Sequence, residues 1–501
     1  MINTLGVNRT IEYDLHPPDL PPTLPDATLR KFYMTRPEKN PVYWYYGSAS
    51  IAFGIKNNAF SYLLLIYSTQ VLGIPGYLAA MALAVAMAWD AVSDLLLGHW
   101  SDKTQSRLGR RHPFMYAGFV LLPISFYALF NPLIELNDSN SWLYLLSTAI
   151  LIRTAVTLVE VPSVALLPDL VKDYDERNKW LVLRHSFGWY GGNGIHVVNM
   201  GIWVGAFGVA SQQGYSIYGL AGALIIAASI LISSLGTQKV AAAMPPPTDP
   251  FKFNEIWKEI KQIAQSVKNV NFFWLFTYSL IVGAAGGMST ALYLYNVTYF
   301  FAFTGPQIAV TGIFVFASPA IAYFLAPALG KSLGKKRAAM AALVVAIFLY
   351  PIPYILTLAG IWPETGSWNS LICYSFFVMS EVVGFIVGGV MLDSMMADVV
   401  EDSELETNRR SEGLFYAARS FASKAVSALG IILAGSIVSL VGMDGIQGVG
   451  DMTNEMRGNL AGFFLPAYCG LYFLAIFLIS KYRIDRETHQ SNLDRLAKQA
   501  G

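Results

Sequence analysis

The sequence is poor in charged residues: of its 501 positions, 13% are Asp, Glu, Lys or Arg, against about 25% in an ordinary soluble domain. It has only two cysteines, both in apolar stretches, so it predicts neither a disulfide framework nor a cysteine-bound metal cluster. The net charge of +1 implies no strongly basic surface, and no nucleic-acid partner is expected. With 54% hydrophobic residues and a mean hydropathy of +0.45, the chain is predicted to be a polytopic membrane protein.

Long apolar stretches predict the membrane segments, because a helix needs about 20 mainly apolar residues to span a bilayer. The sequence contains twelve such stretches, at 44–71, 77–100, 113–130, 142–166, 181–209, 217–235, 272–301, 307–329, 338–359, 368–399, 412–441 and 459–481. None of them alternates in the manner of a β-barrel strand. We therefore expect an all-α membrane protein with twelve transmembrane helices.

Polar segments divide these twelve stretches into two sets of six. The expected parts are a proline-rich tail (1–41), a first six-helix lobe (42–236), a linker with an amphipathic helix (237–270), a second six-helix lobe (271–481) and a C-terminal tail (482–501). Basic loops built around a Leu-Gly pair, SRLGRRHPF (106–114) and KSLGKKRAA (331–339), follow the second stretch of each lobe. They indicate an internal repeat typical of two-lobed transporters, although short cytoplasmic loops are generally basic.

The distribution of Lys and Arg predicts the orientation in the membrane. Of the 34 basic residues, five fall within the predicted spans, when Lys481 at the end of the last span is counted with the tail that follows it. If the N-terminus is cytoplasmic, only Arg457 lies in an outer loop and the other 28 lie inside. Both termini are therefore expected to be cytoplasmic, in a multi-pass protein of the cell (inner) membrane.

Charged side chains within the predicted spans mark the functional region, because a charge at the bilayer centre costs about 2.5–3.5 kcal/mol on insertion scales. Ten lie away from the ends of the spans: Lys56, Asp90, Asp94, Arg153, Glu160, Arg184, Glu381, Asp393, Arg419 and Lys424. Such residues face a water-filled cavity, pair with one another, or both. For Glu381, Asp393 and Arg419, a purely structural pair is as good an interpretation as a functional one.

Asp90 and Asp94 stand four residues apart, so both carboxylates project from one helix face. Two such carboxylates in a poorly solvated place share a proton or hold a cation between them. Na⁺ prefers oxygen ligands, and the hydroxyls of Ser93 and Thr157 would complete its site. The alternative is that these aspartates pair with arginines of the following basic loop and hold the first lobe together.

Polar residues on three other predicted spans suggest a solute site. Arg153, Thr157 and Glu160 lie on one helix stripe, which suits a polyhydroxylated or acidic solute. The further candidates are Lys56 and Asn57 on the first span, Arg184 and Trp189 on the fifth, and Lys424 on the eleventh as a counter-charge to the aspartates. A buried tryptophan is equally often a packing residue.

Three segments resemble a known family. They read DAVSDLLLGHWSDKTQSRLGRRHPF (90–114), VEVPSVALLPDLVKDYDERNKWLVLRHSFGWYGG (159–192) and MMADVVEDSELETNRRSEGLFYAARSFASKAVSALG (395–430). In this order they resemble the glycoside–pentoside–hexuronide:cation symporters of the major facilitator superfamily. The resemblance extends over nearly the whole chain from Tyr46, and it implies the major facilitator fold and cation-coupled transport.

The resemblance also assigns roles to residues. It implies a cation site at Asp90, Ser93, Asp94 and Thr157, with Na⁺ or H⁺ as the coupling ion and no other cofactor. It matches the family's sugar-binding acid to Glu160, its arginine to Arg184 and its eleventh-span lysine to Lys424. The sequence departs from the family's best-known member at Gly54, Val164 and Gly389, where that member has an acid and two tryptophans.

From these departures and from Arg153, which adds a positive charge near Glu160, we expect symport of an acidic glycoside or hexuronide by alternating access. An Arg153→Ala variant should then lose acidic substrates more than neutral ones. The loop residues Asp102, Arg110, Arg111, Glu401 and Asp402 are expected to form opposing parts of a cytoplasmic gate, in a monomeric carrier. The alternatives are a lysophospholipid symporter of the same fold, a membrane enzyme and a non-transporting sensor; neither a catalytic constellation nor a signalling domain is evident.

Overall fold

The computed structural model describes residues 40–171, 174–244, 269–407 and 412–500, and every regular element in these ranges is a helix. The first half contains α2 (Pro41–Asn58), η2 (Ala59–Leu63), α3 (Leu64–Gln70), α4 (Gly76–Lys103), α5 (His112–Phe130), α6 (Ser141–Ala165), α7 (Leu167–Leu170), α8 (Tyr174–Ile202), α9 (Val204–Phe207) and α10 (Gln212–Ala242). The second half contains α12 (Val270–Tyr295), η3 (Asn296–Phe300), α13 (Gly305–Leu333), α14 (Lys335–Leu349), α15 (Ile352–Leu358), α16 (Trp368–Thr407), α17 (Glu412–Val441), η4 (Val449–Asp451), α18 (Asn454–Ser480) and α19 (Arg486–Ala500).

The expected membrane architecture is confirmed in its main feature. Ten helical segments of the described ranges are long and apolar enough to span a membrane. They occupy ten of the twelve expected places, and the remaining two hold α8 and α17, with 29 and 30 residues. These two are not among the ten because α8 is more polar than the ten apolar helices, and because many side chains of α17 lie outside the described part of the chain. The number of twelve crossings and the cytoplasmic termini remain predictions.

Several expected boundaries differ from the observed ones. The fifth helix, α8, ends at Ile202 rather than 209, because the chain bends at Trp203 before the short helix α9. The sixth, α10, continues beyond 236 to Ala242. The proline-rich tail and the amphipathic linker helix fall on residues outside the described ranges. Within the expected C-terminal tail, residues 486–500 form the helix α19.

Local sequence explains where the helices begin. At the start of α2, the Asn40 side chain accepts a hydrogen bond from the Val42 amide, and Pro41 occupies the first turn, where its missing N–H costs nothing. Asn269 caps α12 and Thr453 caps α18 in the same way.

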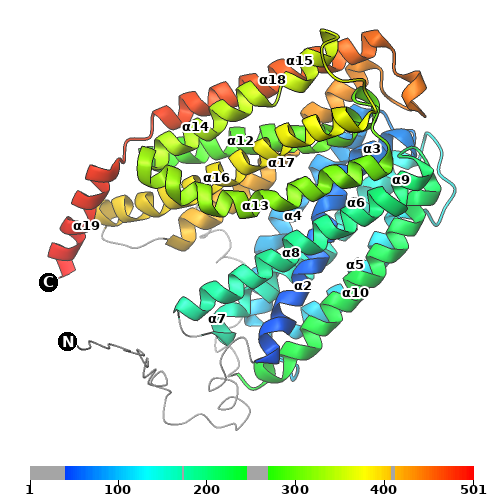
Figure 1. The fold of residues 1–501 in the computed structure, drawn as a ribbon. Coiled ribbons are helices and arrows are strands. Elements are labelled where there is room, and N and C mark those ends of the chain that lie inside the picture. The colour runs from blue at the N-terminus through cyan, green and yellow to red at the C-terminus, as the bar shows by residue number, and fades with distance from the viewer. Residues whose placement is uncertain (1–39, 172–173, 245–268, 408–411, 501) are drawn as a thin grey trace, which may run out of the picture.

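The helices pack as two groups. In the first, α2 lies against α8 and α10, and α6 lies against α4 and α5; in the second, α12 packs on α17 and α18, and α16 on α13 and α14. The groups meet where α4 contacts α17 and where α8 contacts α13. Figure 1 shows that they converge at the end that carries α3 and α9 and diverge toward the end that carries α7 and α19.

Hydrogen bonds join the two groups at the convergent end. The hydroxyls of Thr69 and Tyr295 bond to each other, and Gln70 Nε2 donates to the Met443 carbonyl oxygen at 2.8 Å. The Gly76 amide donates to Asp444 Oδ1, also at 2.8 Å. This end of the molecule is therefore closed by direct contacts between the groups.

Glycines bring α4 and α17 together at the closed end. A Cβ atom on Gly435 would lie 2.3 Å from the Gly76 carbonyl oxygen and 2.4 Å from Ala80 Cβ. Such distances leave no room for a side chain, and small residues are what allow membrane helices to pack backbone to backbone. The closed end thus depends on the absence of side chains at this crossing.

Candidate functional site

Asp90 on α4 and Arg153 on α6 form an ion pair inside the first group of helices. Arg153 Nη1 lies 3.4 Å from Asp90 Oδ2, and the two residues are 6% and 3% exposed. The guanidinium also stacks over the ring of Phe60 in η2, with 4.1 Å from Cζ to the ring centroid. Arg153 was expected at the solute site, and the structure places it at the predicted cation site instead.

Ser93 and Thr157 lie beside this pair, as the sequence predicts. Their hydroxyl oxygens are 3.1 Å apart, and both residues are buried. Thr157 Oγ1 is 3.0 Å from the Arg153 carbonyl oxygen and 3.5 Å from Asp90 Oδ1, so its single proton serves one acceptor at a time. Asp94 is one helical turn further along α4 and is half-buried. The four residues predicted to bind a cation are therefore neighbours.

A second charged pair joins α2 and α6 through Lys56 and Glu160. Lys56 Nζ lies 3.9 Å from Glu160 Oε2, beyond hydrogen-bond distance. The Lys56 side chain is 4% exposed, whereas that of Glu160 is 35% exposed. Glu160 is thus the more accessible partner of a loose pair, which is a suitable arrangement for a polar solute.

Arg184 on α8 is buried close to these groups. Its Nη1 donates to Ser163 Oγ at 3.1 Å, and its guanidinium lies over the rings of Phe53 and Tyr46 at 5.1 and 5.6 Å. The same Ser163 hydroxyl donates to the Glu160 carbonyl oxygen at 2.9 Å. Arg184 is therefore connected to the turn of α6 that carries Glu160.

The other predicted solute-site residues do not take part in the charged pairs described above. The Asn57 side chain is exposed on α2, and Trp189 on α8 is half-buried, with its Nε1 unbonded among the described atoms. Gly54 has a structural reason to lack the family's acid, since a Cβ there would lie 2.0 Å from the Gly188 carbonyl oxygen of α8. Val164 is exposed, and nothing lies within 4 Å of a Cβ built on Gly389.

The second group of helices also carries charged residues that the sequence predicts within the spans. The side chains of Lys424 and Arg419 lie outside the described part of α17, so the predicted counter-charge stays a prediction. Glu381 on α16 accepts hydrogen bonds from the Tyr468 and Ser289 hydroxyls at 3.0 and 3.3 Å. Asp393 is exposed on the same helix. Among the described residues, Glu381 thus belongs to a polar cluster that is separate from the pairs of the first group.

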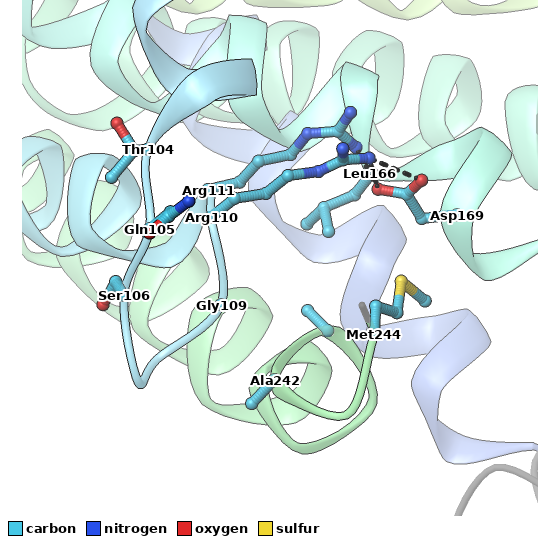
Figure 2. A pocket seen from close by; sticks show the side chains of 11 residues that line it. Thr104, Gln105, Ser106, Gly109, Arg110, Arg111, Leu166, Asp169, Ala242 and Met244 are labelled. Carbon is cyan, nitrogen blue, oxygen red and sulfur yellow. Dashed lines mark hydrogen bonds and ion pairs between the residues drawn. The ribbon is translucent and has the colours of Figure 1, made fainter. Parts of the chain in front are cut away.

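The first Leu-Gly loop is bound to the end of the fourth long helix of its own half. Arg110 Nη2 and Arg111 Nη1 lie 2.7 and 2.6 Å from Asp169 Oδ2 in α7, and Arg111 Nη2 lies 3.0 Å from Asp102 Oδ1. Burial lowers the pKa of Arg111, and the Asp169 carboxylate acts against that shift. Figure 2 shows both guanidinium groups directed at Asp169, above a cavity of about 200 Å³.

The second Leu-Gly loop has the same arrangement. Lys335 Nζ lies 2.6 Å from Asp398 Oδ1 on α16, the fourth long helix of the second half. The glycine of each loop has positive φ, +90° for Gly109 and +79° for Gly334, where a side chain would be strained. Two loops with the same turn and the same type of ion pair support the predicted internal repeat.

The predicted gate residues do not meet in this structure. Glu401 Oε2 lies 3.1 Å from His489 Nδ1, and Asp402 accepts hydrogen bonds from Asn271 and Asn492. Among the described residues, the ion pairs at this end lie within one half or the other. Each basic loop therefore braces its own group of helices, and a gate between them stays a prediction for another conformation.

Sequence reasoning missed Asp169, Asp398 and Phe60. Asp169 and Asp398 each lie within a segment that resembles the family, but the sequence analysis assigns neither of them a role. The repeated Leu-Gly loops could have pointed to them, since a repeated cluster of cations requires anions in each half. No signal marked Phe60, because an aromatic residue in an apolar helix is ordinarily a packing residue.

Comparison with known proteins shows which family this chain resembles. Residues 45–486 match the family model described as MFS/sugar transport protein. A symporter of Synechocystis sp. is 23% identical, over 78% of this chain and 84% of its own. A lactose permease of Lactobacillus delbrueckii is 25% identical over 82% of this chain, and the match spans 64% of its own length. The sodium-dependent lysophosphatidylcholine symporter 1 of Gallus gallus is 23% identical, over 87% of this chain and 84% of its own.

Solved structures show the same fold. A bacterial homologue of the human lysosomal transporter Spinster, inward-facing and unoccupied, superposes with a TM-score of 0.61 at 14% identity, over 90% of this chain and all of its own. The Escherichia coli xylose transporter XylE, partially occluded and inward-open, gives 0.56 at 14% identity, over 89% and 98%. The apolar helices and the symporter relatives together show a multi-pass protein of the cell membrane. Since the family model covers residues 45–486, the chain belongs to the MFS/sugar transport proteins, the glycoside–pentoside–hexuronide:cation symporters that its motifs predict.

Proposed function

We propose that this protein is a secondary active carrier that moves a saccharide, unchanged, together with a cation. The observation that carries the proposal is the cluster of buried charges in the first group of helices, in a chain whose relatives include a lactose permease. Membrane proteins keep charges in their spans mainly where a solute or an ion passes. Transport, rather than chemistry on the solute, is also what the names of the relatives imply.

The saccharide site is centred on Glu160. Its carboxylate is partly exposed, and it can accept hydrogen bonds from sugar hydroxyls in place of its loose contact with Lys56. Trp189 on the neighbouring helix α8 supplies an aromatic face and an indole N–H without a partner among the described atoms. A carboxylate acceptor, a cation and an aromatic face together suit a hydroxylated ring.

An acidic saccharide fits the cations of this region. Lys56 and Arg184 are both buried, and a carboxylate on the solute would form charge-assisted bonds with them. Arg153 no longer supports this substrate class, since it pairs with Asp90. The proposal of a uronide-type substrate therefore rests on Lys56 and Arg184.

Alternating access gives the carrier its cycle. With the termini inside, as the basic loops predict, the closed end faces outward and the divergent end faces the cytoplasm. Rocking of the two groups about α4–α17 and α8–α13 would open the closed end and close the other. The carrier is expected to work as a monomer.

Replacing Glu160 with Gln should weaken saccharide binding about 10- to 150-fold. The reason is that hydrogen bonds to a charged acceptor are worth about 1.5–3 kcal/mol, and 1.4 kcal/mol is a factor of ten. Binding to purified protein by isothermal titration calorimetry measures this effect. Glu135→Gln, on an exposed loop, should bind as the wild type does; equal losses in both variants would reject Glu160 as the sugar acceptor.

Replacing Arg184 with Gln should distinguish acidic from neutral substrates. We expect uronide uptake by proteoliposomes to fall at least tenfold, and neutral glycoside uptake to change less than threefold, because only the uronide carboxylate loses a charged partner. A similar loss for both substrates would show that Arg184 supports the helix packing alone, and the acidic-substrate proposal would then be wrong.

A lysophospholipid is the second candidate solute, favoured by the match to the lysophosphatidylcholine symporter. The exposed Val164 and the open space at Gly389 leave room for an acyl chain. A thermal-shift panel of uronides, neutral glycosides and lysophospholipids on purified protein separates these possibilities. Stabilisation by lysophospholipids only would replace the saccharide proposal with the lipid one.

A further inference from the structure

The position of Arg153 bears on the identity of the coupling ion. The resemblance to the symporter family implies that Asp90, Ser93, Asp94 and Thr157 bind Na⁺ or H⁺, and the structure brings these residues together. It also brings in Arg153, whose Nη1 lies 3.4 Å from Asp90 Oδ2. The predicted cation site of this chain therefore already contains a positively charged side chain, the Arg153 guanidinium.

Arg153 is held firmly in that position. It is 6% exposed, it has the ring of Phe60 4.1 Å from its Cζ, and it stands on the same helix as Thr157, four residues earlier. A guanidinium keeps its charge at every physiological pH. Because the pair is shielded from water, the attraction between Asp90 and Arg153 is screened less than it would be at a surface. The guanidinium is therefore a permanent positive charge beside Asp90.

These residues fit Na⁺ poorly. Na⁺ would need direct contact with a carboxylate oxygen of Asp90 and with the hydroxyls of Ser93 and Thr157. At that place it would lie beside the guanidinium that already contacts Asp90 Oδ2, and two cations would repel each other in a poorly solvated site. The donor set has the right oxygens, but the carboxylate of Asp90 is already paired with a cation.

The charges of the surrounding helices support the same conclusion. Away from the helix ends, the buried or half-buried charges are three anions and three cations, namely Asp90, Asp94, Glu160, Lys56, Arg153 and Arg184. They come from α2, α4, α6 and α8, and they sum to zero without any added ion. The net charge of these six residues is thus zero without a bound Na⁺.

We propose that Arg153 is a built-in counter-ion of Asp90 that takes the place of Na⁺, so that the carrier binds and moves its saccharide without Na⁺. The inference rests on the proposed saccharide transport, and it assigns Arg153 as the residue that determines ion specificity. A charge fixed to the protein stays with it through the cycle, whereas a bound Na⁺ would leave with the saccharide.

The test begins with purified wild-type protein and NaCl alone. Its unfolding temperature should be the same in NaCl and in choline chloride at equal concentration, because no Na⁺ site is present. In Arg153→Ala, the uncompensated aspartates should bind Na⁺, and NaCl should then raise the unfolding temperature in a saturable manner. Arg153→Lys leaves an amino group beside Asp90 and should therefore show no saturable response to NaCl.

Saccharide binding provides the second measurement. Replacing choline with Na⁺ should leave the wild-type Kd unchanged, and should lower that of Arg153→Ala by about 5- to 150-fold, the usual range of coupling between two sites. Wild-type uptake into proteoliposomes should likewise be independent of a Na⁺ gradient. A wild-type protein that is stabilised by Na⁺, or that requires it for uptake, would overturn the inference and leave the transport proposal standing.

The two proposals can fail separately. If no saccharide binds in any salt, the proposed function is wrong, while the unfolding temperatures in NaCl still test the ion specificity. If Arg153→Ala does not fold, the wild-type titration and the Arg153→Lys variant decide the matter. An Arg153→Ala protein that folds but gains no response to Na⁺ would count against Arg153 as the excluding residue.

Discussion

Replacing Gly435 with Val should trap the protein with its closed end open. The Val side chain would need the space of the Gly76 carbonyl oxygen and of Ala80 Cβ, 2.3 and 2.4 Å from its Cβ, and α17 would have to move away from α4. Overpacking of this kind costs about 1–3 kcal/mol. Since this cost applies only to the closed state, the balance between states should shift by about 5- to 150-fold, and uptake should fall accordingly.

Cysteine labelling measures the shift directly. Thr69 is fully buried in the closed end, so a Thr69→Cys reporter, in a background with Cys373 and Cys469 replaced by Ser, should resist maleimide in detergent. The same reporter should react quickly when Gly435→Val is added. Gly462→Val on α18, where nothing lies within 4 Å of the new Cβ, is the matched control and should leave labelling slow. Slow labelling in both variants would mean that the Gly435 crossing does not hold this end closed.

Replacing Asp90 with Asn should destabilise the protein by about 3–5 kcal/mol, the usual cost of removing one partner from a buried ion pair. The loss arises because the Arg153 guanidinium then keeps its charge without the carboxylate 3.4 Å away. Thermal unfolding followed by tryptophan fluorescence in detergent measures the change. The double variant Asp90→Asn with Arg153→Gln should recover most of the loss, since a neutral pair of similar shape leaves no charge uncompensated.

Asp102→Asn is the control for this experiment. It removes a carboxylate that pairs with Arg111 at 3.0 Å, but its side chain is 48% exposed. Exposed pairs contribute about 0–1 kcal/mol, so the unfolding temperature should hardly change. If Asp90→Asn unfolds at the wild-type temperature, or if the double variant is no more stable than the single one, then the Asp90–Arg153 contact is not a stabilising ion pair.

The helices were predictable because each depends on its own apolar stretch. The bilayer requires long continuous helices, and the expected apolar stretches contain them. The predicted boundaries are wrong where the chain bends within an apolar stretch or where a helix continues beyond it. Trp203, for example, ends α8 within an apolar run, and nothing in composition distinguishes that bend. The C-terminal helix α19 was missed because it is polar, and the search was for apolar segments.

The partners of the buried charges were less predictable, because they depend on how helices turn toward one another. Spacing placed Arg153 and Glu160 on one stripe of α6, which suggested one common site. In the structure, Arg153 reaches Asp90 on α4, whereas Glu160 reaches Lys56 on α2. Residues on one face of a long helix contact different neighbouring helices along its length. The positions at which helices cross cannot be read from the sequence.

Gly54 shows the reverse case, in which a departure from the family suggested a change of substrate but has a packing cause. The α8 backbone passes so close to α2 that no side chain fits at this position. The missing acid is therefore required by the approach of the two helices, and it is weaker support for a particular substrate than the sequence alone suggested.

The two basic loops have an evolutionary consequence. In each half, a Leu-Gly turn with a positive-φ glycine follows the second long helix and carries a cation to an aspartate at the fourth, Asp169 or Asp398. Two such braces in equivalent places are the pattern that duplication of one ancestral half would leave. The braces recur in both halves, whereas the Asp90–Arg153 and Lys56–Glu160 pairs lie in the first half. The charged pairs of the first half are thus set on a framework that both halves share.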